Sequence, residues 1–100
     1  MKPTVGRIIH YTITTDEAEQ INRRRADAAI SAGTATGFVL HTGNRAEAGQ
    51  VFPLLITRVW GDQPESAVNG QLFLDGNDTL WVTSATVGEG ERHYAWPGRT

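Results

Sequence analysis

The sequence predicts a mainly β (α+β) fold, a small SH3-like antiparallel barrel of about five strands with one α-helix inserted between strands 1 and 2. Three β-type runs, at residues 51–60, 67–74 and 80–87, follow one another with only short polar breaks. A helical segment separates them from an alternating run near the N-terminus, and glycines stand at the joints. Closure would remove most exposed strand edges, whereas an open antiparallel sheet with the helix across one face is the alternative.

The alternating run predicts a first strand over residues 5–13, with one apolar face and one mixed face. Successive side chains of a strand point to opposite faces, so at most one of His10 and Tyr11 belongs to the core. If Tyr11 is buried with Ile9, then His10 is exposed and can contact a ligand or the helix.

The helix is predicted over residues 16–32. Residues 14–16 offer three candidate N-caps, and Glu17 and Glu19 each stand three residues after one of them, in capping-box register. Gly33 is positioned as the C-terminal cap. The apolar stripe of this helix consists mostly of alanine, which suits packing on a sheet edge or on a partner.

The rest of the chain is predicted to form strands and turns. A short second strand is predicted at residues 38–41, and residues 75–78 predict the turn of a hairpin because they accept positive φ. Asn69 and Gly70 predict a bulge within the strand that precedes this turn. The tail from Gly88 to Pro97 is expected to be irregular.

Size and composition limit the classes of function that this chain can have. At 100 residues the chain is expected to form a single domain spanning residues 1–100, and its 39% apolar and 20% charged residues are ordinary for a globular domain. The absence of cysteine excludes disulfides, thiolate nucleophiles and cysteine-based metal sites. No apolar run approaches the ~20 residues that cross a bilayer, and the polar start lacks a signal-peptide core, so we expect a cytoplasmic protein without membrane contact.

Charge is unevenly distributed, although the net charge is only −2. Residues 59–91 contain six acids and no Lys or Arg, whereas the first 58 residues are mildly basic. A surface that binds duplex nucleic acid is normally basic with clustered Lys and Arg, so a nucleic acid polymer is disfavoured as a partner. A small anion is still compatible with this distribution.

An arginine triplet occupies the predicted helix. Arg23 is spaced to form ion pairs with helix neighbours, whereas Arg25 is directed toward the body of the protein, with Arg24 beside it. Two guanidinium groups so placed could bind a phosphate bidentately. The alternative is that they pair with acids of the 59–91 segment.

The aromatic residues fall into two groups. Three alternate with smaller residues and are expected in the core: Phe52, Phe73 and Trp81. Trp60 and Trp96 each end an element beside glycine or proline, where an indole can stack on a base or on a partner side chain.

No catalytic signature is present. The three histidines lack metal-ligand spacing, no Gly-x-Ser-x-Gly occurs, and the acids of the loops have no apolar setting that would raise a pKa. We therefore expect neither an enzyme nor a cofactor nor a metal site.

Several motifs resemble a family of small bacteriophage and prophage proteins that has no assigned activity. The resemblance covers nearly the whole chain and rests on the segments 6–11 (Gly-Arg-Ile-Ile-His-Tyr), 22–25 (Asn-Arg-Arg-Arg), 58–61 (Arg-Val-Trp-Gly), 65–71, 74–84 (Leu-Asp-Gly-Asn-Asp-Thr-Leu-Trp-Val-Thr-Ser) and 88–97. It implies a phage origin and the cytoplasm of an infected bacterium, and it transfers no functional residue. Small accessory phage proteins include inhibitors of host defence, sponges for cyclic-nucleotide signals and minor virion proteins.

These observations give two hypotheses. The first is a non-catalytic accessory protein that sequesters a small anionic ligand, such as a cyclic-nucleotide immune signal, as a homo-oligomer. Its expected ligand-binding residues are Arg24, Arg25, Trp60, His10, Asn22 and Trp96. The second is a protein-binding module, either a minor virion component or a direct inhibitor of a host protein.

Overall fold

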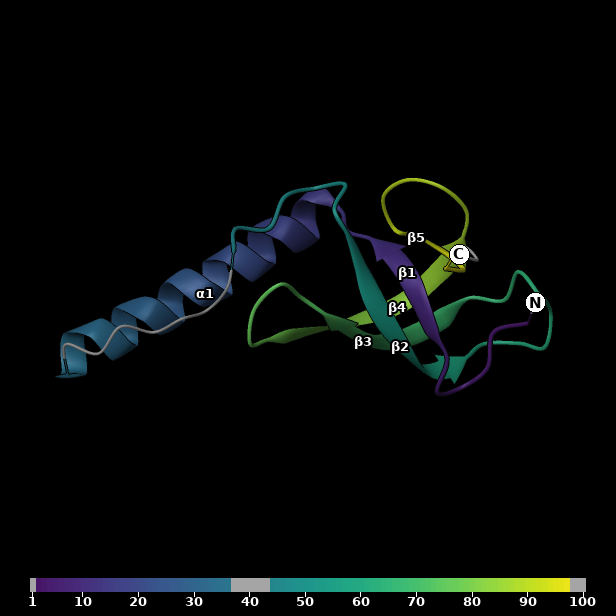
Figure 1. Cartoon of the computed structure of the whole chain (residues 1–100), viewed down its shortest axis with the longest axis horizontal. Helices are drawn as coiled ribbons and strands as arrows, with labels where there is room; N and C mark the ends of the chain where they lie inside the picture. The colour runs from purple at the N-terminus through teal and green to yellow at the C-terminus, as the bar shows by residue number, and fades with distance from the viewer. Residues whose placement is uncertain (1, 37–43, 98–100) are drawn as a thin grey trace.

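The computed structural model describes residues 2–36 and 44–97 (Figure 1). In chain order its elements are β1 (Ile8–Thr12), α1 (Thr15–Thr36), β2 (Val51–Val59), β3 (Val68–Phe73), β4 (Thr79–Val87) and β5 (His93–Ala95). The strand predicted at residues 38–41 lies outside the described residues.

The five strands form a closed barrel in the order β1-β2-β3-β4-β5, and β5 pairs back onto β1. The predicted barrel with one helix between its first two strands is therefore confirmed. Four of the pairings are antiparallel, whereas β4 and β5 pair in parallel. The turn between them includes Gly90 at φ 90° and Arg92 at φ 72°, which fold the chain back beside β4.

The strand β5 corrects the expectation of an irregular tail. It has only three residues, too few for alternation to be recognised in a sequence. Its central residue, Tyr94, is fully buried, and its hydroxyl donates to the carbonyl of Ser66 at 2.9 Å. Closure of the barrel depends on this short segment because β5 is hydrogen-bonded to both β1 and β4.

The hairpin between β3 and β4 is confirmed; a bulge does occur opposite Asn69, but its extra residue lies on β4 and not on the predicted strand, β3. Gly70 pairs with Val82 while Val68 pairs with Ala85, so two residues of β4 oppose the single residue Asn69. The second of those two residues, Ser84, has φ 55°. Glycine is required at position 70, because a Cβ there would collide with the carbonyl oxygen of Leu55.

The core lies inside the barrel and is mostly aliphatic. Its largest fully buried side chains are Tyr11, Tyr94, Ile9, Ile13, Ile21, Leu54, Ile56, Leu72 and Val68. Tyr11 is buried and His10 is exposed, as expected from the alternation in β1. The expected core positions of Trp81 and Phe73 are wrong, since they are 62% and 44% exposed, and Phe52 is only partly buried. The inward positions belong instead to their neighbours, such as Leu80 and Leu72.

The helix α1 begins with the predicted capping box. Thr14 Oγ1 accepts the amide of Glu17 at 3.0 Å, and the Glu17 carboxylate accepts the amide of Thr14 at 2.9 Å. The Tyr11 hydroxyl donates to the same carboxylate at 2.8 Å. Burial, and then this hydrogen bond, raise the pKa of Tyr11 far above its usual value.

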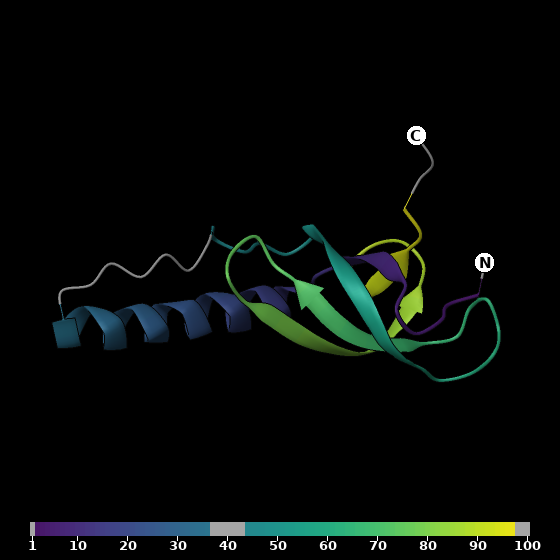
Figure 2. The same cartoon turned by 60° about the horizontal axis from the view of Figure 1, so that its bottom comes forward.

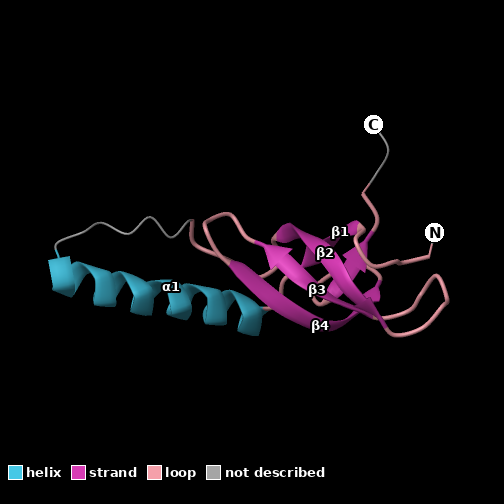
Figure 3. Ribbon diagram, turned by 90° about the horizontal axis from the view of Figure 1, so that it is seen from below, coloured by secondary structure: helices cyan, strands magenta, loops and turns pink. Residues whose placement is uncertain are grey.

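The helix continues through Gly33 to Thr36, so the expected C-terminal cap at Gly33 is wrong. A glycine costs a helix only about 1 kcal/mol, and the alanine-rich residues around it favour continuation. Figures 1 to 3 show α1 leaving the barrel and extending past the β3–β4 hairpin. This projection accounts for the elongated dimensions of 50 × 27 × 22 Å.

Candidate functional site

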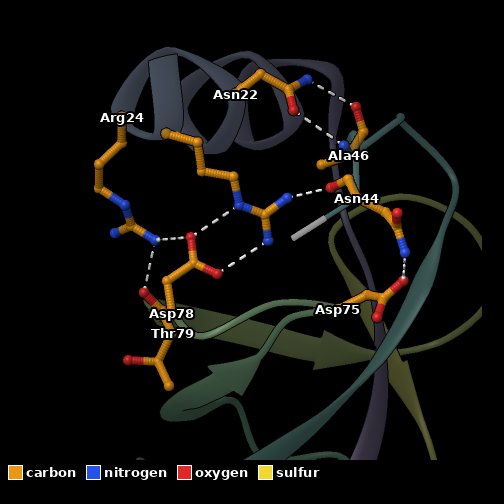
Figure 4. A network of polar contacts seen from close by, with 8 residues as sticks. Asn22, Arg24, Asn44, Ala46, Asp75, Asp78 and Thr79 are labelled. Carbon is orange, nitrogen blue, oxygen red and sulfur yellow. Dashed lines mark hydrogen bonds and ion pairs between the residues drawn. The ribbon is translucent and has the colours of Figure 1, made fainter. Parts of the chain in front are cut away.

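Two expected ligand-binding residues, Arg24 and Arg25, lie where α1 meets the β3–β4 hairpin (Figure 4). The Arg25 side chain is buried, and its guanidinium binds Asp78 bidentately, with Nε to Oδ2 at 3.0 Å and Nη2 to Oδ1 at 2.9 Å. It also donates to the carbonyl of Asn44. Arg24 donates to Asp78 at 3.3 Å and to the Thr79 carbonyl at 2.8 Å. We call this group of residues the helix–hairpin junction.

The charges of the helix–hairpin junction are already paired within the chain. Hydrogen bonds from Arg25, and secondarily from Arg24, hold the pKa of Asp78 below its usual 3.8 despite its partial burial. These contacts correspond to the ion-pair alternative for the arginines. Anion binding by Arg24 or Arg25 stays a prediction. A bound anion would compete with the Asp78 carboxylate for these two guanidinium groups.

Asn22, one helical turn before Arg25, also joins α1 to the segment that precedes β2. Its side-chain amide donates to the Ala46 carbonyl at 2.8 Å and accepts the Ala46 amide at 2.9 Å (Figure 4). This two-way hydrogen bonding fixes the segment before β2 against the helix. A pocket of about 240 Å³ lies beside it, and its lining includes Glu19 and Glu47 against a single cation, Arg45. With two carboxylates and one guanidinium, this pocket is poorly suited to an anion.

Trp60 lies at the other end of the sheet. Its side chain is held in place although the residue is 52% exposed: the indole Nε1–H donates to Asn69 Oδ1 at 2.9 Å. The same oxygen accepts the amide of Ser84 at 2.8 Å, and Asn69 itself is buried. The Arg58 guanidinium carbon lies 3.9 Å from the centre of the Trp60 ring.

Arg58 is a residue that the sequence reasoning missed. The sequence does indicate that Arg58 lies beside Trp60. Residues separated by two on a strand point to the same face, and Arg58 and Trp60 have that spacing.

The remaining expected site residues lie apart from these groups. His10 is exposed in the middle of β1, opposite Pro53 on one side and Ala95 on the other. Trp96 is half-buried against the core and packs edge-to-face on Tyr94, with ring centroids 6.5 Å apart.

The six expected residues therefore do not converge on one site. Trp60 is hydrogen-bonded beside Val68, at the start of β3, whereas Asp78 and its arginines lie beyond Phe73, at the end of β3. A six-residue strand separates those ends by roughly 17 Å.

No protein-family model, curated protein or solved structure matches this chain. The described residues contain no group of three or more His, Cys, Asp or Glu arranged to hold a metal ion. Within the same residues, no helix is both long and apolar enough to cross a membrane.

The outer surface of strands β1 to β4 is the most distinctive feature of the barrel. The pairing register aligns Ile8, Leu55, Gln71 and Trp81 in one row across the four strands. Ile8 is 53% exposed and Trp81 62%. We call this surface the outer face, and it also includes the outward residues of the neighbouring rows: Val51, Pro53, Phe73, His10 and Thr79.

The outer face is almost free of charge. Among the residues of the five described strands, Arg58 is the one with a formal charge. Exposed strands usually carry Lys or Glu, which keep sheets from associating. The core of a protein interface shows the composition found here, with charged residues depleted and aromatic residues enriched.

Proposed function

We propose that this chain is a non-catalytic protein-binding module that holds its partner on the outer face of the barrel. The observation that carries the proposal is the set of exposed apolar side chains on the outer face, namely Ile8, Val51, Phe73 and Trp81, on strands that lack acids and lysine. Covering such a surface removes apolar area from water without desolvating charges, and an exposed tryptophan is typical of residues that dominate binding energy.

The resemblance to small phage proteins suggests what kind of partner this is. A minor virion component would bind another virion protein, and a direct inhibitor would bind a host protein. Both roles require the same surface, so one experiment tests the module before the partner is known.

The experiment compares capture by the wild-type protein with capture by two variants that place an arginine at an exposed apolar position. Trp81→Arg alters the outer face, whereas Val5→Arg alters a residue that is 67% exposed and precedes β1. We expect a stoichiometric partner from infected cells to bind the wild type and Val5→Arg, and purified partner to bind Trp81→Arg at least 100-fold more weakly. Equal affinity for both variants would contradict the proposal.

The sequestration of a small anion, such as a cyclic nucleotide, is the second candidate function. It is favoured by one observation: the Arg24 side chain is 44% exposed, and two guanidinium groups share the single carboxylate of Asp78. A ligand present at 100 times its Kd should stabilise the fold by about 2.7 kcal/mol, which raises the melting temperature of a domain of this size by roughly 10 °C or more.

The test of this second function is a panel of linear and cyclic nucleotides. Arg24→Gln should abolish any shift in melting temperature, and Arg23→Gln, on the adjacent exposed residue, should keep it. A panel that produces no shift removes this function.

A further inference from the structure

We infer that Arg58, stacked on Trp60, is an anchor for a carboxylate group, and that the partner is an acidic peptide segment with apolar residues beside the acid. The inference rests on the proposed protein-binding function and adds the chemistry of the partner. It is carried by three properties of Arg58: its side chain is held in place, its charge has no ion-pair partner among the described residues, and it stands on a strand of the outer face.

The Arg58 guanidinium is held by a chain of contacts that leads into the core. It lies 3.9 Å from the centre of the Trp60 ring, and the ring is fixed by the hydrogen bond from Nε1 to Asn69. Asn69 is only 7% exposed, and its oxygen also accepts the amide of Ser84, a residue at φ 55°. An arginine positioned in this way loses less rotamer entropy on binding than a free one.

The charge of Arg58 has no counterpart in the described part of the chain. Arg24 and Arg25 share Asp78 there, whereas the Arg58 guanidinium lies over the Trp60 ring and forms no ion pair with a described acid. A guanidinium stacked on a ring still presents its N–H groups at the edge of its plane. That edge matches the two oxygens of a carboxylate in a bidentate arrangement.

The position of Arg58 connects the anchor to the outer face. It belongs to β2, the strand that supplies Val51, Pro53 and Leu55 to that face, and it is the one charged residue among the described strands. A partner that covers the outer face would therefore meet the Arg58 charge on the same strand as these apolar residues. Complementarity calls for one negative charge next to apolar side chains.

The surroundings favour a carboxylate over a phosphate. The loop that follows Trp60 carries Asp62 and Glu65, both exposed, and the hydrogen bond from the Trp60 amide to the Ala67 carbonyl closes this loop beside the indole. A phosphate dianion carries twice the charge of a carboxylate, so the acids of this loop disfavour a phosphate more strongly than a single carboxylate.

The experiment selects binders from a displayed library of random 12-residue peptides on the intact protein. The selected peptides are then titrated against the wild type and four variants, each checked for folding by its melting temperature: Arg58→Gln, Arg58→Lys, Arg45→Gln and Trp81→Arg. We expect the selected peptides to be enriched in Asp and Glu beside apolar residues, and to bind Arg58→Gln about tenfold more weakly. Arg58→Lys should bind these peptides nearly as weakly as Arg58→Gln because lysine lacks the planar guanidinium.

The matched control is Arg45→Gln. Arg45 is exposed and lines the pocket beside α1, so the affinity of this variant for the peptides should equal that of the wild type.

The outcomes separate this inference from the function on which it rests. Peptides that lose binding with Trp81→Arg but not with Arg58→Gln would overturn the anchor and leave the module intact. Peptides that bind Trp81→Arg as well as the wild type, or a library that yields none, would overturn both. A shift of the Trp60 indole resonance with nucleotides and not with the acidic peptides would overturn the carboxylate assignment in favour of a phosphate.

Discussion

At the scale of single residues, Asp78 connects the helix to the barrel. It receives three hydrogen bonds from two arginines, one of which is buried on the helix. A buried guanidinium without a counter-ion is strongly unfavourable, so the carboxylate stabilises the fold mainly by preventing that state.

Replacing Asp78 should therefore destabilise the protein. We expect Asp78→Ala to lower the free energy of unfolding by about 3 kcal/mol, because it leaves the buried Arg25 charge unpaired. Urea denaturation measures this loss, and Asp62→Ala, at an exposed loop position, should change the stability by less than about 0.5 kcal/mol. An equal effect of the two changes would contradict the role assigned to Asp78.

The same carboxylate predicts a dependence on pH. The pKa of Asp78 is lower in the folded protein than its usual 3.8, so near that pH the unfolded chain binds more protons. The stabilisation is fully present above the unfolded pKa and is lost as the pH falls through the folded pKa. Denaturation curves from pH 6 to pH 2 should show a shallower acid loss for Asp78→Asn than for the wild type.

At the scale of elements, α1 is fixed at its start and extends beyond the hairpin (Figure 1). Glu17 takes part in three hydrogen bonds. Its carboxylate accepts from the Thr14 amide and the Tyr11 hydroxyl, and its own amide donates to the Thr14 hydroxyl oxygen. The first turn of the helix is thus tied to β1. The start of the helix could be predicted because a capping box is local in the sequence.

Glu17→Ala should cost about 2 kcal/mol, from the lost cap and the Tyr11 hydroxyl left without its partner. Thermal unfolding followed by circular dichroism measures the change. The control is Glu19→Ala, an exposed acid of the same first turns, which should leave the melting temperature within a few degrees of the wild-type value.

At the scale of the whole molecule, closure of the barrel depends on Tyr94. The ring of this residue is fully buried and its hydroxyl reaches the Ser66 carbonyl, while its backbone pairs with Tyr11 on one side and Val87 on the other. Burial, and then the charge of Glu65, raise its pKa. The barrel therefore closes through a segment that supplies both packing and a hydrogen bond.

Tyr94→Phe should cost about 1 kcal/mol, the worth of one hydrogen bond, whereas Tyr94→Ala should cost about 4 kcal/mol through the cavity it creates. Chemical denaturation of the two variants separates the two contributions. A similar loss for both would show that the hydroxyl, and not the ring, holds the barrel closed.

The sequence predicted more of the fold than of the site. The β3–β4 hairpin and the capping box at Glu17 were predictable because each is set by residues within a few positions of one another. The bulge was expected on β3, but the register between the two strands places its extra residue on β4. Trp81 was assigned to the wrong face because alternation gives a period of two but not which of its two phases points inward. Leu80 and Val82 occupy the interior instead.

The chain by itself determined a β-rich barrel with one inserted helix and the absence of a catalytic motif. Tertiary structure decided that Arg25 meets Asp78 and that Arg58 rests on a Trp60 ring fixed by Asn69. It also decided that three residues around Tyr94 close the barrel. The physical reason is the range of the interactions: caps and turns are local, whereas the partner of a charge and the exposed face of a closed sheet follow from contacts between distant segments.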